Sequence, residues 1–366
     1  MGPAYSDIKD IRAVSDSEVE IQLTRPSSFA LEALDLNVTK PGTPPVSAGP
    51  FQTQSEDEDG AVVMTANERY HLGKPAISKV MLKPYQSVRS AWADLLRGNL
   101  DMLYEVGDDA LDSLEPSSRV KVFSYRRHYA YIVLFNMARP ALANAKLRRS
   151  LNSAINREQL IADGLGTRGA PAVSPVWPDH WAVSENAPGF GYAPEPIADS
   201  SHRIRLQCLI GDPAHERLAI ALQRQLQSVG VDLDLQLVGI ESALKRMVAK
   251  DFDVLLIEAI SGPSLLRPYL FWHSKGPYNY GGYHSEDVDA ALDSIRYATH
   301  DDAYRAGVAA FQRSIVDDPP AIFLAWSERA RAISTAFDVQ VEAGRDPVST
   351  LRLWRPVANG ATAGVN

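Results

Sequence analysis

The sequence predicts an α/β protein, and three observations lead to this fold class. Residues 203–258 alternate strand and helix patterns in the order β-α-β-α-β, which is typical of parallel strands joined by right-handed crossovers. Residues 129–136 form a nearly continuous apolar run, as strands that are buried on both faces do. The hydrophobic content of 45% and the charged content of 22% are those of an ordinary globular protein, and 366 residues suffice for two domains.

Short strands and one clear helix account for the first part of the chain. Residues 8–23 alternate in apolar character and predict a hairpin that turns at Ser15-Asp16-Ser17. A connector rich in Pro, Gly and Ser follows at 41–50, and a hairpin tip is expected at 55–60. The other elements expected here are strands at 61–65, 77–84, 100–106 and 120–125, and helices at 86–97, which Gly98 ends, and near 108–114.

The second part of the chain alternates helices and strands more regularly. Asp212 and Pro213 predict a helix start, apolar residues then recur at helical spacing, and Gly230 ends the helix. Asn156 is expected to cap another short helix. The other elements expected here are helices at 143–155, 240–249, 285–298 and 301–317, strands at 204–210, 231–238, 252–258 and 321–326, an ordered loop at 164–200, and a disordered end at 357–366.

Three strand ends of the β-α-β-α-β unit, at Gly211, Gly239 and Glu258, are expected to share one edge of the sheet. Ligands of α/β proteins bind at the carboxyl ends of strands, so this edge is the expected position of a ligand. An aromatic-rich stretch follows the turn Ser261-Gly262-Pro263. Its rings form either a pocket wall or the packing of a helix on the sheet, and composition favours neither. They belong to Tyr269, Phe271, Trp272, Tyr278, Tyr280 and Tyr283.

Charge and cysteine content narrow the class of partner. The net charge of −8 argues against nucleic acid or an anionic membrane as the main partner. Cys208 is the one cysteine, so no intrachain disulfide can form, and its alternating position predicts a small buried hydrophobe. No apolar run reaches the ~20 residues of a membrane span, and the first residues do not have the pattern of a secretory signal.

Catalytic and nucleotide motifs are matched only in part. GLGTRG at 164–169 has the glycine spacing of a dinucleotide loop, but it follows a helix where that motif requires a strand. Ser242 and Lys245 match S-x-x-K without the S-D-N and K-T-G motifs of the enzymes that use it. SEDEDG at 55–60 begins like a calcium loop, but Ala66 stands where the closing Glu would be. We expect no enzyme activity, no cofactor and no metal; a hydrolase using Ser242 and Lys245 is an alternative.

From residue 47 onward the chain resembles the family 5 extracellular solute-binding proteins, which are the dipeptide-, oligopeptide- and nickel-binding components of ABC importers. The strongest similarity is at 134–157, LFNMARPALANAKLRRSLNSAINR, which resembles the family pattern F-N-x-x-x-P-F-x-D-x-R-V-R-x-A-l-x-x-A-i-D-R. Weaker similarities occur in the family's order at 47–51, 66–71, 98–101 and 283–289, and residues 5–40 resemble the segment that precedes them.

The resemblance implies a two-lobe α/β fold of the periplasmic-binding-protein type (type II), with a hinge and here N-terminally truncated. The hinge would lie near Asn136–Pro140 and again near 327–335. Lobe closure on a ligand would shift an open–closed equilibrium. The domains expected on this basis are 1–47 as a remnant of the small domain and connector, 48–137 as lobe I, 138–330 as lobe II, and 331–366 as a return to lobe I with a tail.

The function implied by the resemblance is capture of a peptide-like or other small organic solute between the lobes for import. The implied partners are the solute and the ABC permease subunits, the implied oligomeric state is a monomer, and the implied compartment is periplasmic or extracellular and membrane-associated. Two alternatives use the same fold: a cytoplasmic ligand-sensing domain of a regulator, and a truncated member without function. The missing signal pattern favours the regulator, and the absence of any DNA-binding segment disfavours it.

The expected ligand site departs from the family pattern in one respect. Peptide-binding members carry G-W-x-x-D-Y-x-x-P after the strand that corresponds to 252–258, and their Asp holds the amino terminus of the peptide. Residues 258–269 of this chain have neither that Trp nor that Asp, which argues against ordinary free peptides. Arg267 would favour a carboxylate or phosphate, or would pair with Glu258. The candidate ligand-binding residues are Glu258, Ser261, Gly262, Ser264, Arg267, Tyr269, Trp272, Tyr129, Tyr131, Asn136 and Trp177.

Overall fold

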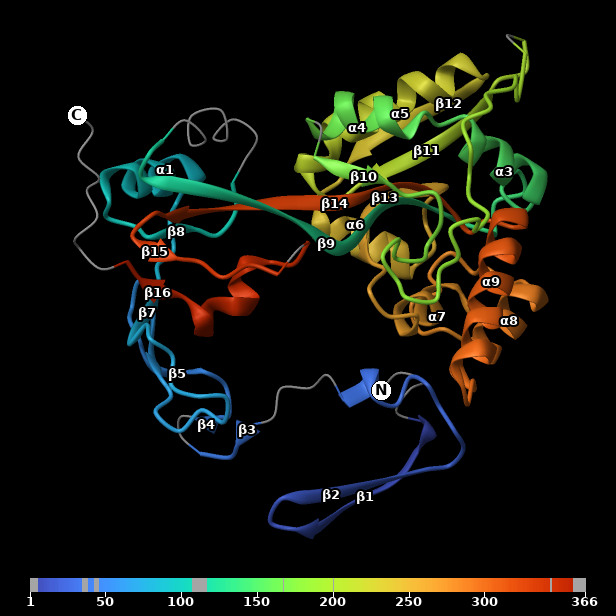
Figure 1. Cartoon of the computed structure of the whole chain (residues 1–366). Coiled ribbons are helices and arrows are strands. Elements are labelled where there is room, and N and C mark those ends of the chain that lie inside the picture. The colour runs from blue at the N-terminus through green and yellow to red at the C-terminus, as the bar shows by residue number, and fades with distance from the viewer. Residues whose placement is uncertain are drawn as a thin grey trace. The chain divides into compact units, whose positions relative to one another are not determined.

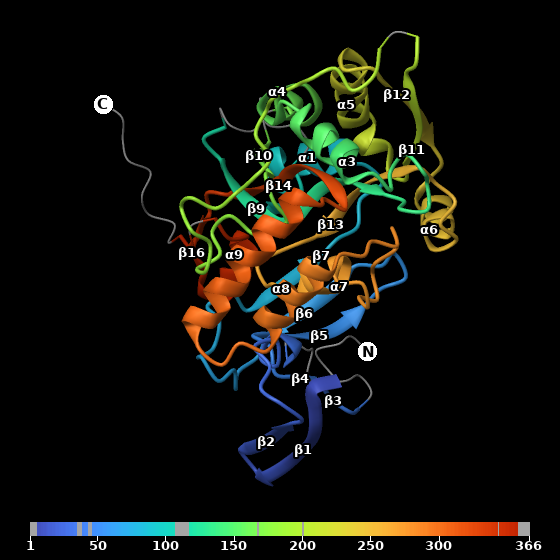
Figure 2. The same cartoon turned by 90° about the vertical axis from the view of Figure 1, so that its right-hand side faces the viewer.

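The computed structural model describes residues 6–34, 39–42, 46–106, 117–166, 168–199, 201–342 and 344–357, and Figures 1 and 2 show its strands and helices. The strands are β1 (Ile8–Ser15), β2 (Glu18–Leu23), β3 (Thr39–Lys40), β4 (Val46–Ser47), β5 (Phe51–Glu56), β6 (Val62–Ala66), β7 (Lys79–Leu82), β8 (Met102–Leu103), β9 (Val120–Phe135), β10 (Gly169–Pro171), β11 (Ile204–Ile210), β12 (Val231–Leu237), β13 (Val254–Ile260), β14 (Ala321–Ser334), β15 (Phe337–Asp338) and β16 (Arg355–Pro356). The helices are α1 (Val88–Arg97), α3 (Ala145–Ser153), α4 (Arg157–Leu165), α5 (Glu216–Ser228), α6 (Ile240–Val248), α7 (Leu266–Trp272), α8 (Glu286–Arg296) and α9 (Asp301–Asp317), with short 3-10 helices η2 (Glu32–Leu34), η3 (Pro213–His215) and η4 (Pro347–Leu353). Within the described ranges, no helix has the length and apolar character needed to cross a lipid bilayer.

The chain divides into two compact units. Unit 1 consists of residues 1–35 and 128–327, and unit 2 consists of residues 36–127 and 328–366. The chain therefore passes between the units inside β9 and inside β14. The lobe boundaries expected from the sequence, at 137–138 and 330–331, lie about ten and three residues further along the chain than the boundaries of the units. The assignment of the units to lobes stays a prediction.

The predicted β-α-β-α-β unit is confirmed and forms the centre of unit 1. β11 pairs in parallel with β12 from Ile204 opposite Val231 to Ile210 opposite Leu237. β13 pairs in parallel with the other side of β11 and antiparallel with β9. The strand order of the sheet is β10-β14-β9-β13-β11-β12, with β8 also paired to β14. The carboxyl ends of β11, β12 and β13 therefore share one edge, as predicted.

Helices cover both faces of the sheet of unit 1, because side chains alternate between the two faces along each strand. Tyr131, Val133 and Phe135 of β9 belong to the core cluster that contains the buried residues of α3, α4 and α5. Ile132 and Leu134 belong to the cluster on the other face, which contains buried residues of α6, α7, α8 and α9. Figures 1 and 2 show α4 and α5 on one side of the strands and α7 and α8 on the other.

The family-like segment 134–157 contributes buried polar side chains that bind backbone carbonyls. The Asn136 amide donates to the carbonyls of Lys250 and Phe252. The Arg148 guanidinium donates to the carbonyl of Pro319 and pairs with Asp318. Asn156 caps α4 as predicted, since its side chain accepts a hydrogen bond from the backbone N–H of Gln159.

Arg157 connects four segments of unit 1 without a carboxylate partner among the described residues. Its guanidinium donates to the carbonyls of Ala172, Phe323, Ile155 and Phe190, and to that of Asn152 at the end of α3. Burial lowers the pKa of this guanidinium to about 10. Arg157 therefore holds the loop after β10, strand β14 and helices α3 and α4 in one arrangement.

The extent of several elements differs from the prediction. The strands expected at 120–125 and 129–136 form one strand, β9, since no Gly or Pro interrupts the stretch between them. The strand expected at 321–326 continues to Ser334, and the one expected at 100–106 is reduced to Met102–Leu103. The loop at 164–200 contains β10, which pairs with β14. The helix expected near 108–114 and almost all of the end at 357–366 lie outside the described residues.

Unit 2 contains the antiparallel sheet β5-β6-β7 and helix α1. Ser87 caps the start of α1, and Gly98 ends it in the left-handed conformation with φ of 81°, as the sequence predicts. Leu95 of α1 packs with Leu103 and Ala332 in a small core of this unit.

Candidate functional site

Glu258 and Tyr131 lie opposite each other at the carboxyl end of β13. They are register partners in the antiparallel pair β13–β9, and Tyr129 stands opposite Ile260 two residues further. Directly paired residues project from the same face of a sheet, so Glu258 and Tyr131 both face the side of α3, α4 and α5. The ring of Tyr131 meets His215 edge-on with a centroid distance of 5.3 Å. The strand-end edge therefore carries a carboxylate, phenols and an imidazole together.

The turn after β13 packs against Trp177. The backbone N–H groups of Ser261 and Gly262 donate to the carbonyl of His128 at 2.9 and 3.2 Å. A Cβ at Gly262 would lie 2.9 Å from Cε3 of Trp177, so only glycine allows the indole to approach this closely. Trp177 also meets the rings of His128 and Trp326 edge-on, at centroid distances of 5.0 and 4.9 Å. The structure thus brings the predicted residues Ser261, Gly262 and Trp177 together.

Ser264 and Arg267 face Glu32, a residue of the first segment of the chain. The Ser264 hydroxyl donates to Oε2 of Glu32 at 2.5 Å. Burial raises the pKa of Glu32, whereas the hydrogen bond from Ser264 and the charge of Arg267 act in the opposite direction. Arg267 is half-buried and acts on Glu32 through its charge. The alternative of a pair with Glu258 stays a prediction.

Tyr269 and Trp272 of α7 are core residues in this structure. Tyr269 is 4% exposed, packs edge-on against Phe29 and exchanges hydrogen bonds through its hydroxyl with Asp293 and Arg296. Burial raises the pKa of this phenol to about 12. Trp272 is 2% exposed and meets Phe323 edge-on at a centroid distance of 5.8 Å. Of the two interpretations of the aromatic run, packing therefore describes these two rings.

Asn136 is not brought to the other candidate residues. It follows β9 directly, at the end where Phe135 pairs with Val254, whereas Tyr129 pairs with Ile260 at the opposite end of β13. Six residues of extended strand separate these ends, which corresponds to roughly 20 Å. The Asn136 amide is 1% exposed and is occupied by the carbonyls of Lys250 and Phe252. Its role in this structure is to hold the loop before β13.

Four residues of the site region were not predicted from the sequence. Glu32 contacts Ser264, and His215 contacts Tyr131. His128 and Trp326 both contact Trp177. His215 could have been found, because it follows the helix start at Asp212-Pro213 directly after a strand that ends at the ligand edge. Glu32 could not, because it is more than 200 residues from Ser264 in the sequence and belongs to no motif.

Metal and nucleophile chemistry have little support in the described residues. No group of three His, Cys, Asp or Glu side chains there is arranged to hold a metal ion. Ser242 and Lys245 line a shallow recess of about 420 Å³ beside the strand-end edge, but no hydrogen bond between described residues joins the two side chains. Cys208 is fully buried, and burial raises the pKa of its thiol to about 12, so it has the character of a small hydrophobe.

Comparisons with known proteins identify the family. Residues 2–281 match the family model of bacterial extracellular solute-binding proteins, family 5 Middle. The probable D,D-dipeptide-binding periplasmic protein of Escherichia coli is 21% identical over 291 residues, which cover 76% of this chain and 56% of that protein. The oligopeptide-binding protein AppA of Bacillus subtilis is 22% identical over 370 residues, which cover 88% of this chain and 68% of AppA. The chain thus spans between about half and two thirds of the length of these relatives.

The solved structures show the same fold. NikZ from Campylobacter jejuni, in complex with Ni(L-His), superposes with a TM-score of 0.81 at 20% identity, covering 96% of this chain and 79% of NikZ. The predicted α/β fold of the periplasmic-binding-protein type is therefore confirmed. Because the family model matches more than half of the chain, this protein belongs to the bacterial extracellular solute-binding proteins of family 5.

Proposed function

We propose that the protein is the solute-binding component of an ABC importer and captures a peptide-like or other small organic solute. The observation that carries this proposal is the match to the solute-binding family over residues 2–281. The names of the relatives support it, since they describe D,D-dipeptide-binding and oligopeptide-binding proteins. The partners would be ABC permease subunits, the working form a monomer, and the compartment the periplasm or the outer face of a membrane.

We place the solute contacts at the strand-end edge and the adjoining turn. Tyr129 and Glu258 offer a hydroxyl and a carboxylate group on neighbouring strands, and Tyr131, which is 2% exposed, would support them from the core. Ser261, Gly262 and Trp177 offer a close backbone approach beside an indole ring. This combination of a few polar groups and aromatic surface is typical of small-molecule sites. Tyr269, Trp272 and Asn136 would support the site through the core rather than through contact with the solute.

The chemistry of the solute follows from Ser264 and Arg267. The residues after β13 do not include the Asp with which peptide-binding members hold a free amino terminus. The guanidinium of Arg267, with its planar fork of donors, suits a carboxylate or phosphate group. An acidic solute would compete with Glu32 for Ser264 and for the charge of Arg267. We therefore expect an acidic group on the solute rather than a free ammonium group.

Mass spectrometry of small molecules released from the purified protein tests this function. The expected result is one class of organic solute at close to one molecule per protein. Adding that class back should raise the melting temperature, because a ligand at one hundred times its Kd stabilises a protein by about 2.7 kcal/mol.

The variant Arg267→Ala should weaken the stabilising effect of the solute, and Arg313→Ala on the exposed side of α9 should not. If no solute is released, and neither dipeptides, oligopeptides nor acidic amino acids raise the melting temperature, the proposed function is wrong. A solute that binds equally to wild type and Arg267→Ala would retain the function but remove Arg267 from the site.

A further inference from the structure

A pocket in unit 1 lies next to the candidate solute site, because Trp326 borders both, but it includes no residue of the strand-end edge or of the turn after β13. It is bounded by the segment 171–188 and by helix α9, and its volume is about 350 Å³. Three prolines, three valines and the ring of Trp326 supply most of its wall. Trp177 is not part of this wall, although its neighbours Val176 and Pro178 are, because its indole points toward Gly262. The segment 176–178 therefore separates this pocket from the candidate solute site.

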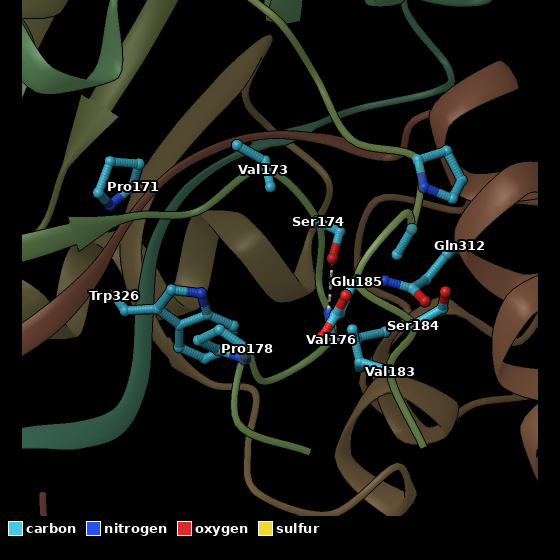
Figure 3. Close-up of a pocket in the computed structure, with 12 residues that line it drawn as sticks. Pro171, Val173, Ser174, Val176, Pro178, Val183, Ser184, Glu185, Gln312 and Trp326 are labelled. Atoms are coloured by element: carbon cyan, nitrogen blue, oxygen red, sulfur yellow. Dashed lines mark hydrogen bonds between the residues drawn. The ribbon is translucent and has the colours of Figure 1, made fainter. Parts of the chain in front are cut away.

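Gln312 gives this mainly apolar pocket a polar group that a ligand could bind. Its side chain is only 3% exposed, and Figure 3 shows it entering the pocket from α9, opposite Trp326. The amide forms no hydrogen bond with any of the residues that the structure describes. Neither amide atom is among the fully buried side-chain atoms that have no partner, so both can be reached from the pocket, where water or a ligand would occupy them. Both the donor and the acceptor of this amide are therefore available to a molecule inside the pocket.

The charges around the pocket favour a neutral ligand. Glu185 is exposed at the rim and would repel an anion. Arg157 lies behind the wall, but backbone carbonyls, among them those of Ala172 and Phe323, occupy its donors. Ser174 is likewise engaged, since its hydroxyl accepts a hydrogen bond from the backbone of Val176. Among these groups, the Gln312 amide is the one directed at the interior of the pocket.

We propose that this pocket binds a small neutral molecule in which an apolar ring carries a carboxamide. The ligand amide would pair with the Gln312 amide through two parallel hydrogen bonds, since each group offers one N–H and one carbonyl in the same plane. The ring would lie against Trp326 and the proline rings, as is typical of mainly apolar pockets with few polar groups. The volume is at the lower end for ligand pockets, which limits the ligand to a single ring with a short substituent. This site does not depend on the transport function.

Benzamide is the probe for this proposal, and benzoate has the same shape with a negative charge. Both are titrated into the full chain by saturation-transfer NMR. We expect saturable binding of benzamide, and binding of benzoate that is about tenfold weaker or more. The variant Gln312→Leu should weaken benzamide binding by about tenfold or more, because the amide pair is lost. The exposed Gln227→Leu on α5 is the matched control and should bind benzamide as wild type does.

A second variant, Ala187→Leu, fills the pocket from its wall and leaves Gln312 in place. This variant should abolish benzamide binding. Because it leaves Gln312 unchanged, it tests the pocket even if Gln312→Leu does not fold. The melting temperature of Gln312→Leu should be equal to or higher than that of wild type, because no hydrogen bond to another described residue is lost. Equal benzamide affinity in wild type, Gln312→Leu and Ala187→Leu would overturn the proposal, as would the absence of saturation up to about 20 mM benzamide.

Discussion

Glu32 illustrates how a single half-buried carboxylate links the first segment of the chain to the turn after β13. Its side chain accepts a hydrogen bond from Ser264, and Arg267 supplies a nearby positive charge. Desolvation nevertheless raises its pKa, so the folded protein favours the protonated form more than the unfolded chain does. A raised carboxyl pKa means that stability is fully present below the unfolded pKa and is lost as pH rises through the folded pKa.

The variant Glu32→Gln should therefore be more stable than wild type at pH 7. This advantage should shrink as the pH falls through the raised folded pKa and should be gone below about 4.3, the pKa of an unfolded Glu. Urea titrations of both proteins at pH 7 and at a pH below about 4.3 give the free energies of unfolding that test this difference. Glu18→Gln, at the start of the exposed strand β2, is the control and should leave the free energy of unfolding nearly unchanged under both conditions. A Glu32→Gln variant that is less stable than wild type at pH 7 would mean that the hydrogen bond from Ser264 outweighs desolvation.

Trp272 tests whether the aromatic residues of α7 belong to the core. The ring is 2% exposed and packs on Phe323 of β14. Truncation of a buried aromatic ring removes its transfer energy and leaves a cavity, so Trp272→Ala should lower the free energy of unfolding by about 3–5 kcal/mol. Trp181→Ala is the matched control, since Trp181 is 49% exposed and its loss should cost clearly less. Equal unfolding energies for the two variants would contradict the core assignment; chemical denaturation provides the measurement.

The elements differ in how well their residues predict them. The β-α-β-α-β unit could be predicted because apolar periodicity, the Asp212-Pro213 start and Gly230 all indicate the same boundaries. The length of β9 could not, because Arg126, Arg127 and His128 interrupt its apolar pattern while its backbone stays extended. A pattern of side chains reports burial, and a strand that continues past its buried part leaves no such signal.

Only those contacts of the candidate site that strand pairing determines could be predicted from the sequence. Glu258 and Tyr131 meet because both stand at one end of paired strands, which topology determines. The contacts of Ser264 with Glu32 and of Gly262 with Trp177 join segments that are distant in sequence and belong to no motif. The motif at 134–157 identifies the family through structural residues such as Asn136 and Arg157. It therefore predicts the fold, but it says nothing of the solute.

Arg157 holds several secondary-structure elements of unit 1 together. Its guanidinium binds five carbonyls from the ends of α3 and β10, the loop before β11 and strand β14. Arg157→Met keeps the apolar stem but leaves buried carbonyls without donors, so it should lower the free energy of unfolding by roughly 3–5 kcal/mol. Arg149→Met on α3, where the side chain is exposed, should cost less than about 1 kcal/mol. Similar losses in both variants, measured by urea unfolding, would contradict this role.

At the scale of the whole molecule, the two compact units share two strands. β9 has 16 residues and β14 has 14, and the boundary between the units falls inside both. These strands are also neighbours in the sheet order. Melting one unit would therefore require two neighbouring strands to be ordered at one end and disordered at the other. Such a state loses pairing without releasing the full chain entropy, so it should be poorly populated.

We therefore expect the units to unfold together, although proteins of this size with two units often unfold in steps. Differential scanning calorimetry should show one transition, with a calorimetric enthalpy equal to the van't Hoff enthalpy. A proline in place of Arg127 would break β9 at the boundary, because proline cannot donate to a strand ladder, and should split the transition in two. Proline in place of Glu18, at the start of the exposed strand β2, is the control and should leave a single transition. Two transitions in the wild-type protein would show that the shared strands do not couple the units.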